Sequence, residues 1–362
     1  MEQTVDTLGM LELISRPAFC VKEGIILRVN QAAKGILLEP GSPLDALLAT
    51  GQQEYAQFEG RSCLYLTLRI AGESLGASVT RMEDVDVFVL EQDSDQAELR
   101  TMALAAQELR ASLSSVMTTA DRLFPSICDA GASPSIHEQT AWINRGLFQM
   151  LRTISNMSDA DRYCTTAARP ESRDVDALFS EIFQQASVLA SHTGLSIDYT
   201  GLDRPLYCLV EPERLERAAY NMLSNAMKFT PKGGKIRGVL RREGGMLYLT
   251  VLDSGSGIPD NLRSNLFDRY RRSPSLEDGR FGIGLGMVLI RAAASAHGGT
   301  VLIEQPKEGG TRITMSMQIR RSLGGQLKSP ILRVDYAGER DHSLIELSEV
   351  LPSALYDSEQ FY

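Results

Sequence analysis

The sequence predicts a multidomain α+β protein, and three observations support this fold class. The chain has 362 residues, which is enough for two or three domains of ordinary size. Strand-like patterns are grouped near the N-terminus and again in the second half of the chain. The stretch between these groups has apolar residues at helical spacing and few helix breakers. A hydrophobic content of 43% is sufficient for buried cores.

Residues 1–92 are predicted to form a small mixed domain. Two short strands are expected around a Glu-Gly turn within residues 19–30, followed by a short helix at 31–38 that Asn30 caps. Two further strands are expected at residues 64–70 and 85–90. This order of elements resembles a PAS sensory domain. The alternative is a small α+β domain that serves dimer contacts.

Residues 93–165 are predicted to form a helical hairpin. One apolar stripe consists of Leu99, Met102, Ala106, Leu109, Leu113, Val116 and Ala120, and the other of Leu147, Leu151, Ile154 and Met157. Pro125, Gly131 and Pro134 are expected to separate the two helices. Because a lone hairpin cannot bury both stripes, two copies are expected to pair as a dimeric four-helix bundle. Pro170 and its polar neighbours between residues 165 and 173 are expected to form a linker.

Residues 166–320 carry four short motifs in a fixed order. The motifs are Asn221–Phe229, Asp253–Pro259 after an apolar run at 247–252, Phe267–Arg272 and Gly282–Met287. Together they resemble the ATP-binding domain of sensor histidine kinases, gyrase, Hsp90 and MutL. This resemblance implies a two-layer α/β sandwich of the GHKL, or Bergerat, type. It also implies that the domain binds ATP with Mg²⁺.

The resemblance assigns a role to each motif. Asp253 would accept the adenine amino proton, and Gly255 and Gly257 would let the backbone turn beside the base. Asn225 would bind Mg²⁺ through its amide oxygen, and Arg272 would neutralise phosphate charge. Asn221 and Lys228 would face the phosphates from the same helix. The other expected ATP contacts are Phe229, Ile258, Gly282, Ile283, Gly284, Leu285, Gly286, Met287 and Thr311.

The resemblance extends to residues 107–113, where the sequence departs from the family at the phosphorylated position. Gln107 stands where the family has the acceptor histidine, and an amide has no nucleophilic ring nitrogen. Glu108 fills the place of the family's general base. Ala111 replaces the Thr or Asn that orients water for phosphate removal, and Ser112 replaces a kink-forming proline, which predicts a straighter helix. The chain is therefore expected to bind ATP without phosphorylating itself at the usual site.

Three functions follow from these residues and stay open. The first is a cytoplasmic, histidine-kinase-like signalling protein of a two-component system or phosphorelay. The second is an active kinase that phosphorylates a partner or another histidine, with His137 as the candidate. The third is a non-catalytic, ATP-bound dimeric scaffold, in effect a pseudokinase. The expected partners are a second copy of the chain or another kinase, and a response regulator.

Composition and charge exclude other classes of protein. The net charge of -9 leaves no basic surplus for nucleic-acid phosphates. No run of 18 apolar residues predicts a membrane span, and the first residues lack the basic region of a signal peptide. The 5 cysteines include no C-x-x-C pair, which favours reduced thiols and a cytoplasmic location. Residues 321–362 are predicted to be a C-terminal extension with an amphipathic helix at 343–351, packed on the preceding domain in preference to a docking tail.

Overall fold

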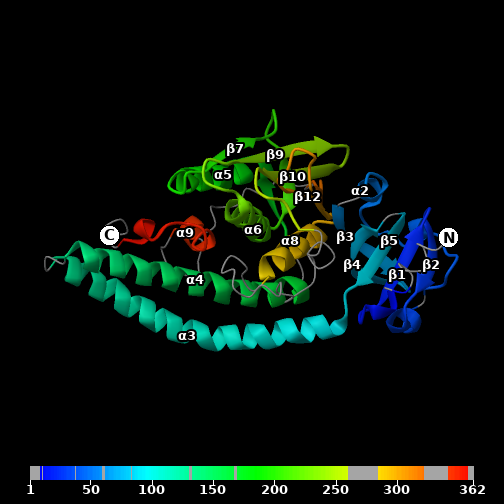
Figure 1. The fold of residues 1–362 in the computed structure, drawn as a ribbon, viewed down its shortest axis with the longest axis horizontal. Helices are drawn as coiled ribbons and strands as arrows, with labels where there is room; N and C mark the ends of the chain where they lie inside the picture. Colours follow the sequence, from blue (N-terminus) through cyan, green and yellow to red (C-terminus); the bar gives the residue numbers. More distant parts are fainter. Residues whose placement is uncertain are drawn as a thin grey trace.

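The computed structural model places most of the chain in three regions of regular structure and a C-terminal segment (Figure 1). The residues that it describes are 9, 11–36, 38–58, 62–82, 84–129, 133–166, 169–259, 284–321 and 341–357. The mixture of helices with a large sheet confirms the predicted α+β class. Within these residues, no helix is long and apolar enough to cross a membrane.

The N-terminal region is a five-stranded antiparallel sheet in the order β2-β1-β5-β4-β3. Its strands are β1 (Ala18–Lys22), β2 (Ile25–Val29), β3 (Ser62–Ile70), β4 (Glu73–Met82) and β5 (Val85–Leu90). Short helices η1 (Leu11–Leu13), η2 (Gln31–Gly35), η3 (Leu44–Ala46) and α2 (Gln52–Ala56) complete it. The strands predicted at 64–70 and 85–90 are confirmed, whereas β4, with its alternating small and polar residues, was not expected.

The predicted turn and cap in this region are also confirmed. Glu23 and Gly24 have positive φ angles of 51° and 76°, as the tight connection between β1 and β2 requires. Asn30 Oδ1 accepts from Ala33 N at 3.0 Å and so caps η2. The same oxygen accepts from Ala18 N, which fastens the cap to β1.

The helical hairpin consists of α3 (Asp93–Asp129) and α4 (Pro134–Thr165), which run side by side in opposite directions (Figure 1). Pro134 is the first residue of α4, where a backbone N–H would have no partner within the helix, so its absence does not destabilise the helix. The prediction that Pro125 lies between the helices was wrong, because α3 continues through Pro125 to Asp129. A proline removes a single helical hydrogen bond, and the neighbouring Phe124 is buried, so packing holds this turn.

The third region is a two-layer sandwich with helices on one face of a mixed sheet. Its strands are β6 (Glu171–Asp174), β7 (Ser196–Thr200), β8 (Tyr207–Val210), β9 (Lys235–Glu243), β10 (Met246–Asp253), β11 (Val301–Glu304) and β12 (Arg312–Gln318). Its helices are α5 (Val175–Ser191), α6 (Pro212–Phe229) and α8 (Leu285–Ala296). Residues 171–173, predicted as linker, instead form β6, because their backbone pairs with β8 in a separate two-stranded sheet.

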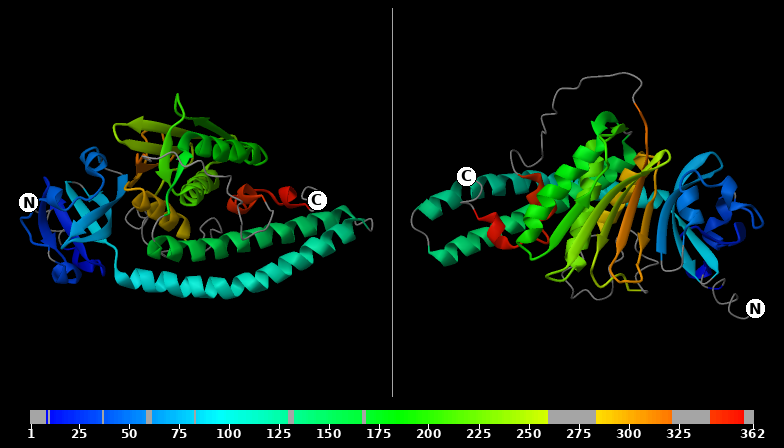
Figure 2. Two further views of the ribbon diagram at one scale, coloured as in Figure 1. Left: turned by 180° about the vertical axis from the view of Figure 1, so that it is seen from behind. Right: turned by 90° about the horizontal axis from the view of Figure 1, so that it is seen from above.

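The N-terminal sheet and the sandwich sheet join into one sheet of ten strands. Strand β3 pairs antiparallel with β11, with Tyr65 opposite Val301 and Ser62 opposite Glu304. The right-hand view of Figure 2 shows the blue N-terminal strands continuing from the orange strands of the sandwich. This junction covers β11, which would otherwise be the exposed edge of the sandwich sheet.

The C-terminal segment at 341–357 contains α9 (His342–Glu346) and η4 (Ser353–Tyr356). The predicted helix at 343–351 is therefore too long. Helix α9 ends at Glu346, and Leu347 and Leu351 beyond it are both fully buried. The segment packs on α4, α5 and α6, so the expectation of a packed layer is confirmed for these residues.

Candidate nucleotide-binding site

The end of β10 directs a buried carboxylate into the site. Asp253 is the last residue of β10, and its Oδ1 accepts from Gly255 N at 2.8 Å and from Thr311 N at 3.1 Å. Burial raises the pKa of the Asp253 carboxyl, and the two amide hydrogen bonds oppose that shift. These amides fix the direction of the carboxylate, as recognition of one base edge would require.

The loop after β10 lies directly against the turn before β12. Gly310 has φ of 80°, and a Cβ there would lie 1.9 Å from the carbonyl oxygen of Asp253. Only glycine fits such an approach. Gly257 is buried and Ile258 half-buried as the loop continues. The structure therefore brings the predicted adenine contacts Asp253, Gly255 and Thr311 together.

Helix α6 connects this loop to the glycine motif that opens α8. Asn221 is buried and faces Gly286, where a Cβ would lie 2.8 Å from Asn221 Oδ1. One helical turn further on, Asn225 is half-buried, and the carbonyl of Phe229 lies against Gly255. Three motifs that are far apart in the sequence thus meet along α6.

Helix α8 begins at Leu285, with Gly284 at its N-cap in a left-handed conformation of φ 80°. Leu285 is buried against Leu99, Ala160 and Tyr163 of the hairpin, and Met287 is half-buried. The base of the hairpin therefore packs on the helix that follows the glycine motif. Arg272, Gly282 and Ile283 lie outside the described residues.

Two residues predicted to contact phosphates have protein partners. Asn221 Nδ2 donates to the carbonyl of Arg217 at 2.7 Å, and Asn221 Oδ1 accepts from Arg152 Nη2 of α4 at 3.3 Å. Lys228 forms an ion pair with Glu349 of the C-terminal segment. Arg152 and Glu349 could not be predicted as partners, because nothing in the sequence indicates that α4 and the C-terminal segment lie against α6.

The hairpin residues that resemble the family's phosphorylation motif lie on the surface of α3. Gln107, Glu108, Ala111 and Ser112 are all exposed on α3, which runs unbroken through Ser112 as one helix. Position 107, where the resemblance places the acceptor histidine, carries the exposed Gln107, and the neighbouring Glu108 is exposed as well.

Of the other histidines, His297 has a clear structural role. Its ring is buried, with Nδ1 2.7 Å from the carbonyl of Ala293 and Nε2 accepting from Glu211 N at 3.0 Å. Burial lowers the pKa of His297, which keeps the ring neutral. The interpretation of this histidine as part of a structural turn is confirmed. His137 is half-buried on α4, 3.9 Å from Asp357.

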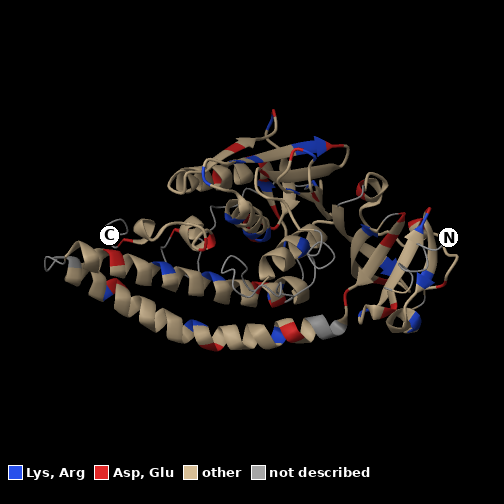
Figure 3. Ribbon diagram, in the orientation of Figure 1, with Lys and Arg blue, Asp and Glu red and all other residues tan. Residues whose placement is uncertain are grey.

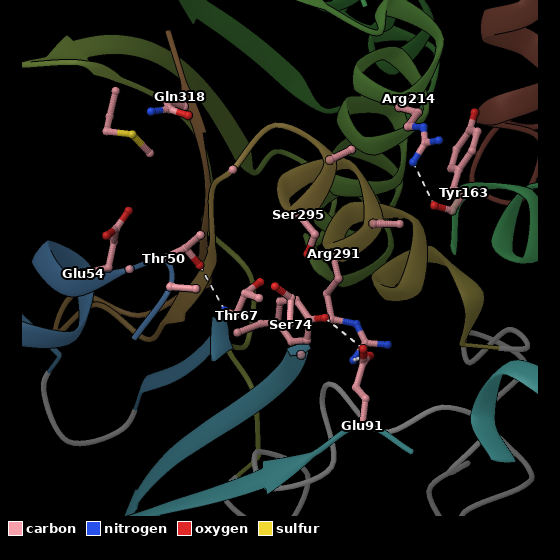
Figure 4. Close-up of a pocket in the computed structure, with 18 of the residues that line it drawn as sticks. Thr50, Glu54, Thr67, Ser74, Glu91, Tyr163, Arg214, Arg291, Ser295 and Gln318 are labelled. Carbon is pink, nitrogen blue, oxygen red and sulfur yellow. Dashed lines mark hydrogen bonds and ion pairs between the residues drawn. The ribbon is translucent and has the colours of Figure 1, made fainter. Parts of the chain in front are cut away.

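Apart from this site, a hollow of about 1000 Å³ lies between the N-terminal sheet and the sandwich (Figure 4). Arg291 of α8 points across it toward Glu91 and pairs with it at 3.0 Å, while the guanidinium lies over the ring of Tyr65. On another wall, Thr50 accepts from Thr67 N at 3.0 Å. In the described part of the chain, no group of three His, Cys, Asp or Glu side chains could hold a metal ion.

Comparison with known proteins agrees with this geometry. Residues 210–321 match the family model described as histidine kinase-, DNA gyrase B- and HSP90-like ATPase. The chain is 24% identical over 247 residues to hybrid signal transduction histidine kinase D of Dictyostelium discoideum, a match that covers 65% of this chain and 16% of that protein. It is 28% identical over 245 residues to the histidine protein kinase DivJ of Caulobacter vibrioides, covering 62% and 40% respectively.

A solved structure shares the fold. Full-length ShkA, crystallised in complex with AMPPNP, superimposes with a TM-score of 0.50 at 20% identity, covering 62% of this chain and 46% of that one. Together these findings support a histidine kinase family for this chain, with a GHKL-type ATP-binding domain at residues 210–321. The match spans less than half the length of these relatives.

Proposed function

We propose that this chain is a dimeric, histidine-kinase-like signalling protein that binds ATP in the site at the ends of β10 and α6. The observation that carries this proposal is the Asp253 carboxylate, held by the amides of Gly255 and Thr311 at the mouth of a glycine-lined loop. An oriented carboxylate accepts a hydrogen bond from the adenine amino group, whereas guanine presents an oxygen there and is repelled. The site thus selects adenine.

Mg²⁺ binding is proposed at Asn225, whose amide oxygen is the kind of ligand that this ion prefers. Asn225 is half-buried one helical turn from Asn221, between the glycine motif of α8 and the carbonyl of Phe229. When ATP is bound, its phosphate oxygens supply most of the coordination shell. Asn225 would position the ion, but its neutral amide would compensate little of the ion's positive charge.

Dimerisation through the hairpin is supported by two exposed apolar rows. On α3, Leu109, Val116 and Leu123 lie seven residues apart, and on α4, Ile136, Ile143 and Met150 repeat at the same interval; all six are exposed. Apolar residues at this interval form the seam of a helical bundle. We infer that a second hairpin covers both rows. Light scattering at micromolar concentration tests this assembly, and a monomer mass with intact helices would contradict it.

Phosphoryl transfer to position 107 is not part of the proposal, because the Gln107 amide cannot act as a nucleophile. The chain would act in a two-component pathway through its ATP-dependent conformation, or through a partner that carries the acceptor histidine. The five-stranded N-terminal sheet, joined to the ATP-binding domain through β3 and β11, supports a PAS-like sensory role for residues 1–92. Labelling with radioactive ATP tests the expected lack of phosphoryl transfer to the hairpin, and strong acid-labile labelling of the wild-type hairpin would refute it.

Calorimetry with ATP and with GTP tests the site. The wild-type protein should bind ATP and discriminate against GTP, and Asp253→Asn should weaken ATP binding by about tenfold and reduce the discrimination, because a neutral amide can donate to the guanine oxygen. Asp198→Asn, an exposed position on β7, is the matched control and should change neither affinity. Equal affinity of the wild-type protein for both nucleotides would rule out the role of Asp253.

A further inference from the structure

The C-terminal segment at 341–357, here called the strap, is held along its backbone by α4. Arg145 donates to the carbonyls of Ser348 and Glu349, each at 3.2 Å, and Gln149 Nε2 donates to the carbonyl of Ser348 at 3.0 Å. Further along, Asn144 Nδ2 donates to the carbonyl of Tyr356 at 3.1 Å. Helix α4 therefore fixes the path of the strap independently of the strap's charges.

Apolar packing fastens the strap at the same time. Leu347 and Leu351 are fully buried, and so is Tyr356, whose hydroxyl donates to the carbonyl of Leu344 at 2.8 Å. The Tyr356 ring packs edge-on against Phe148 of α4, with ring centroids 5.1 Å apart. The apolar side chains of the strap are thus part of the hydrophobic core between α4 and α6.

Two acidic residues of the strap face cations of α4 and α6, and Figure 3 shows basic positions on α6 beside an acidic position on α9. Glu346 is fully buried and pairs with Arg217. Glu349 is partly exposed, at 28%, and pairs with Arg152 at 2.9 Å and with Lys228. Burial would raise the pKa of Glu349, but the charges of Arg152 and Lys228 outweigh it and hold the pKa below its usual range.

We propose that Glu349 is an internal competitor for the phosphate subsite of the ATP-binding domain. This inference rests on the proposed function, with Lys228 of α6 facing the phosphates of the bound ATP as the family resemblance implies. The carboxylate of Glu349 neutralises Lys228, so ATP binds only at the cost of that ion pair. Glu346 stays in place as the anchor, and the exposed end of the Glu349 side chain is the only part that has to move.

The arrangement also connects the nucleotide site to the hairpin. Arg152 belongs to α4, pairs with Glu349 and donates to Asn221 Oδ1 in the nucleotide-binding helix. When Glu349 leaves Lys228, the charge balance at Arg152 changes as well. Nucleotide occupancy is thereby coupled to the position of α4, and the coupling is reciprocal: whatever shifts α4 alters the affinity for ATP.

A cycle of four full-length proteins tests this inference by calorimetry with Mg-ATP: wild type, Glu349→Gln, Lys228→Gln and the double variant. Glu349→Gln should tighten ATP binding by about fivefold, since a partly exposed ion pair is broken. The tightening should vanish in the Lys228→Gln background. Glu243→Gln, an exposed position at the far end of β9, carries the same charge change and should leave the affinity unaltered.

Arg145→Ala provides a second variant that leaves both the nucleotide site and the strap carboxylates intact. It removes two of the three hydrogen bonds that α4 donates to the strap backbone at Ser348 and Glu349, and it should also tighten ATP binding. Equal ATP affinity of wild type, Glu349→Gln and Arg145→Ala would overturn the inference and leave the proposed function standing. Absence of ATP binding in every folded variant would instead overturn the proposed function, and the inference with it.

Discussion

The ATP-binding domain is held by two junctions of opposite chemistry. On one side, β3 of the N-terminal region pairs with β11 through backbone hydrogen bonds, so the main contact is one that almost any strand could make. On the other side, the strap and α4 meet α6 through buried charges, with Arg217, Glu346 and Asp159 all nearly inaccessible to solvent. We therefore expect the first junction to tolerate substitution and the second to depend on individual side chains.

This difference has an energetic cause. A strand pair leaves no backbone group unsatisfied, and changing one side chain leaves the ladder intact. A buried ion pair recovers its desolvation cost only while every partner is present. The charged junction should therefore be the sensitive one, and the sheet junction the robust one.

Removing Arg217 should have the largest effect. Its guanidinium pairs with Glu346 and Asp159 and donates to Asn156 Oδ1 at 2.9 Å. Arg217→Ala removes one counter-charge from each of two buried carboxylates, while Arg162 stays beside Asp159 and Arg152 and His342 stay beside Glu346. The free energy of unfolding should therefore fall by about 3 kcal/mol. Urea unfolding measures this loss. Arg237→Ala, exposed on β9, is the control and should cost less than about 0.5 kcal/mol. A similar small loss for Arg217→Ala would mean that the charged junction is not the sensitive one.

Arg291 gives the corresponding test of the sheet junction. It pairs with Glu91 at 3.0 Å and lies over Tyr65, which is opposite Val301 in the ladder. Glu91 is partly exposed, so water can replace its partner, and Arg291→Met should lower the free energy of unfolding by only about 1–2 kcal/mol. A double-mutant cycle with Glu91→Gln isolates the ion pair. Hydrogen exchange should show the amides of β3 and β11 still protected; their loss of protection would show that the ladder depends on this side chain.

The sequence predicted local features well and the junctions poorly. The turn at Glu23, the cap at Asn30 and the strand that ends at Asp253 follow from residue preferences within a few positions of the chain. The convergence of Asp253 and Thr311 followed from the resemblance, since the two are far apart in sequence.

The remaining features depend on contacts that have no local signal. The β3–β11 pairing uses backbone groups, so no residue type marks it. The short α9 ends where tertiary burial of Leu347 outweighs an apolar pattern that suits a longer helix. The pairing of Glu349 with Lys228 could not be predicted, because charges on a tail are more commonly solvated.

His342 should give the smallest effect and a defined pH dependence. Its ring lies 3.1 Å from Glu216 and 3.5 Å from Glu346, and edge-on to Tyr220. Burial and the charge of Arg217 lower the pKa of His342, but the two carboxylates outweigh them and raise it above its usual value. A raised pKa stabilises the fold below the unfolded-state value and loses that contribution as the pH rises through the folded-state value.

Glu346 determines the lower limit of the pH range in which the charged junction is most stable. Burial would raise its pKa, but Arg217, His342 and Arg152 lower it, so its contribution is present above the unfolded-state pKa and is lost as the pH falls through the folded-state value. The charged junction should therefore be strongest between the two unfolded-state values of 4.5 and 6.5.

The measurement is the difference in free energy of unfolding between wild type and His342→Gln from about pH 5.5 to about pH 8.5. Taking the difference removes the contribution of His297, whose lowered pKa acts in the opposite direction. The wild-type advantage should shrink as the pH rises, while the sheet junction, monitored by exchange of the β3 and β11 amides, should not change. A constant difference across this range would mean that His342 does not gain charge stabilisation from Glu216 and Glu346, and that the strap is held by Arg217 and packing alone.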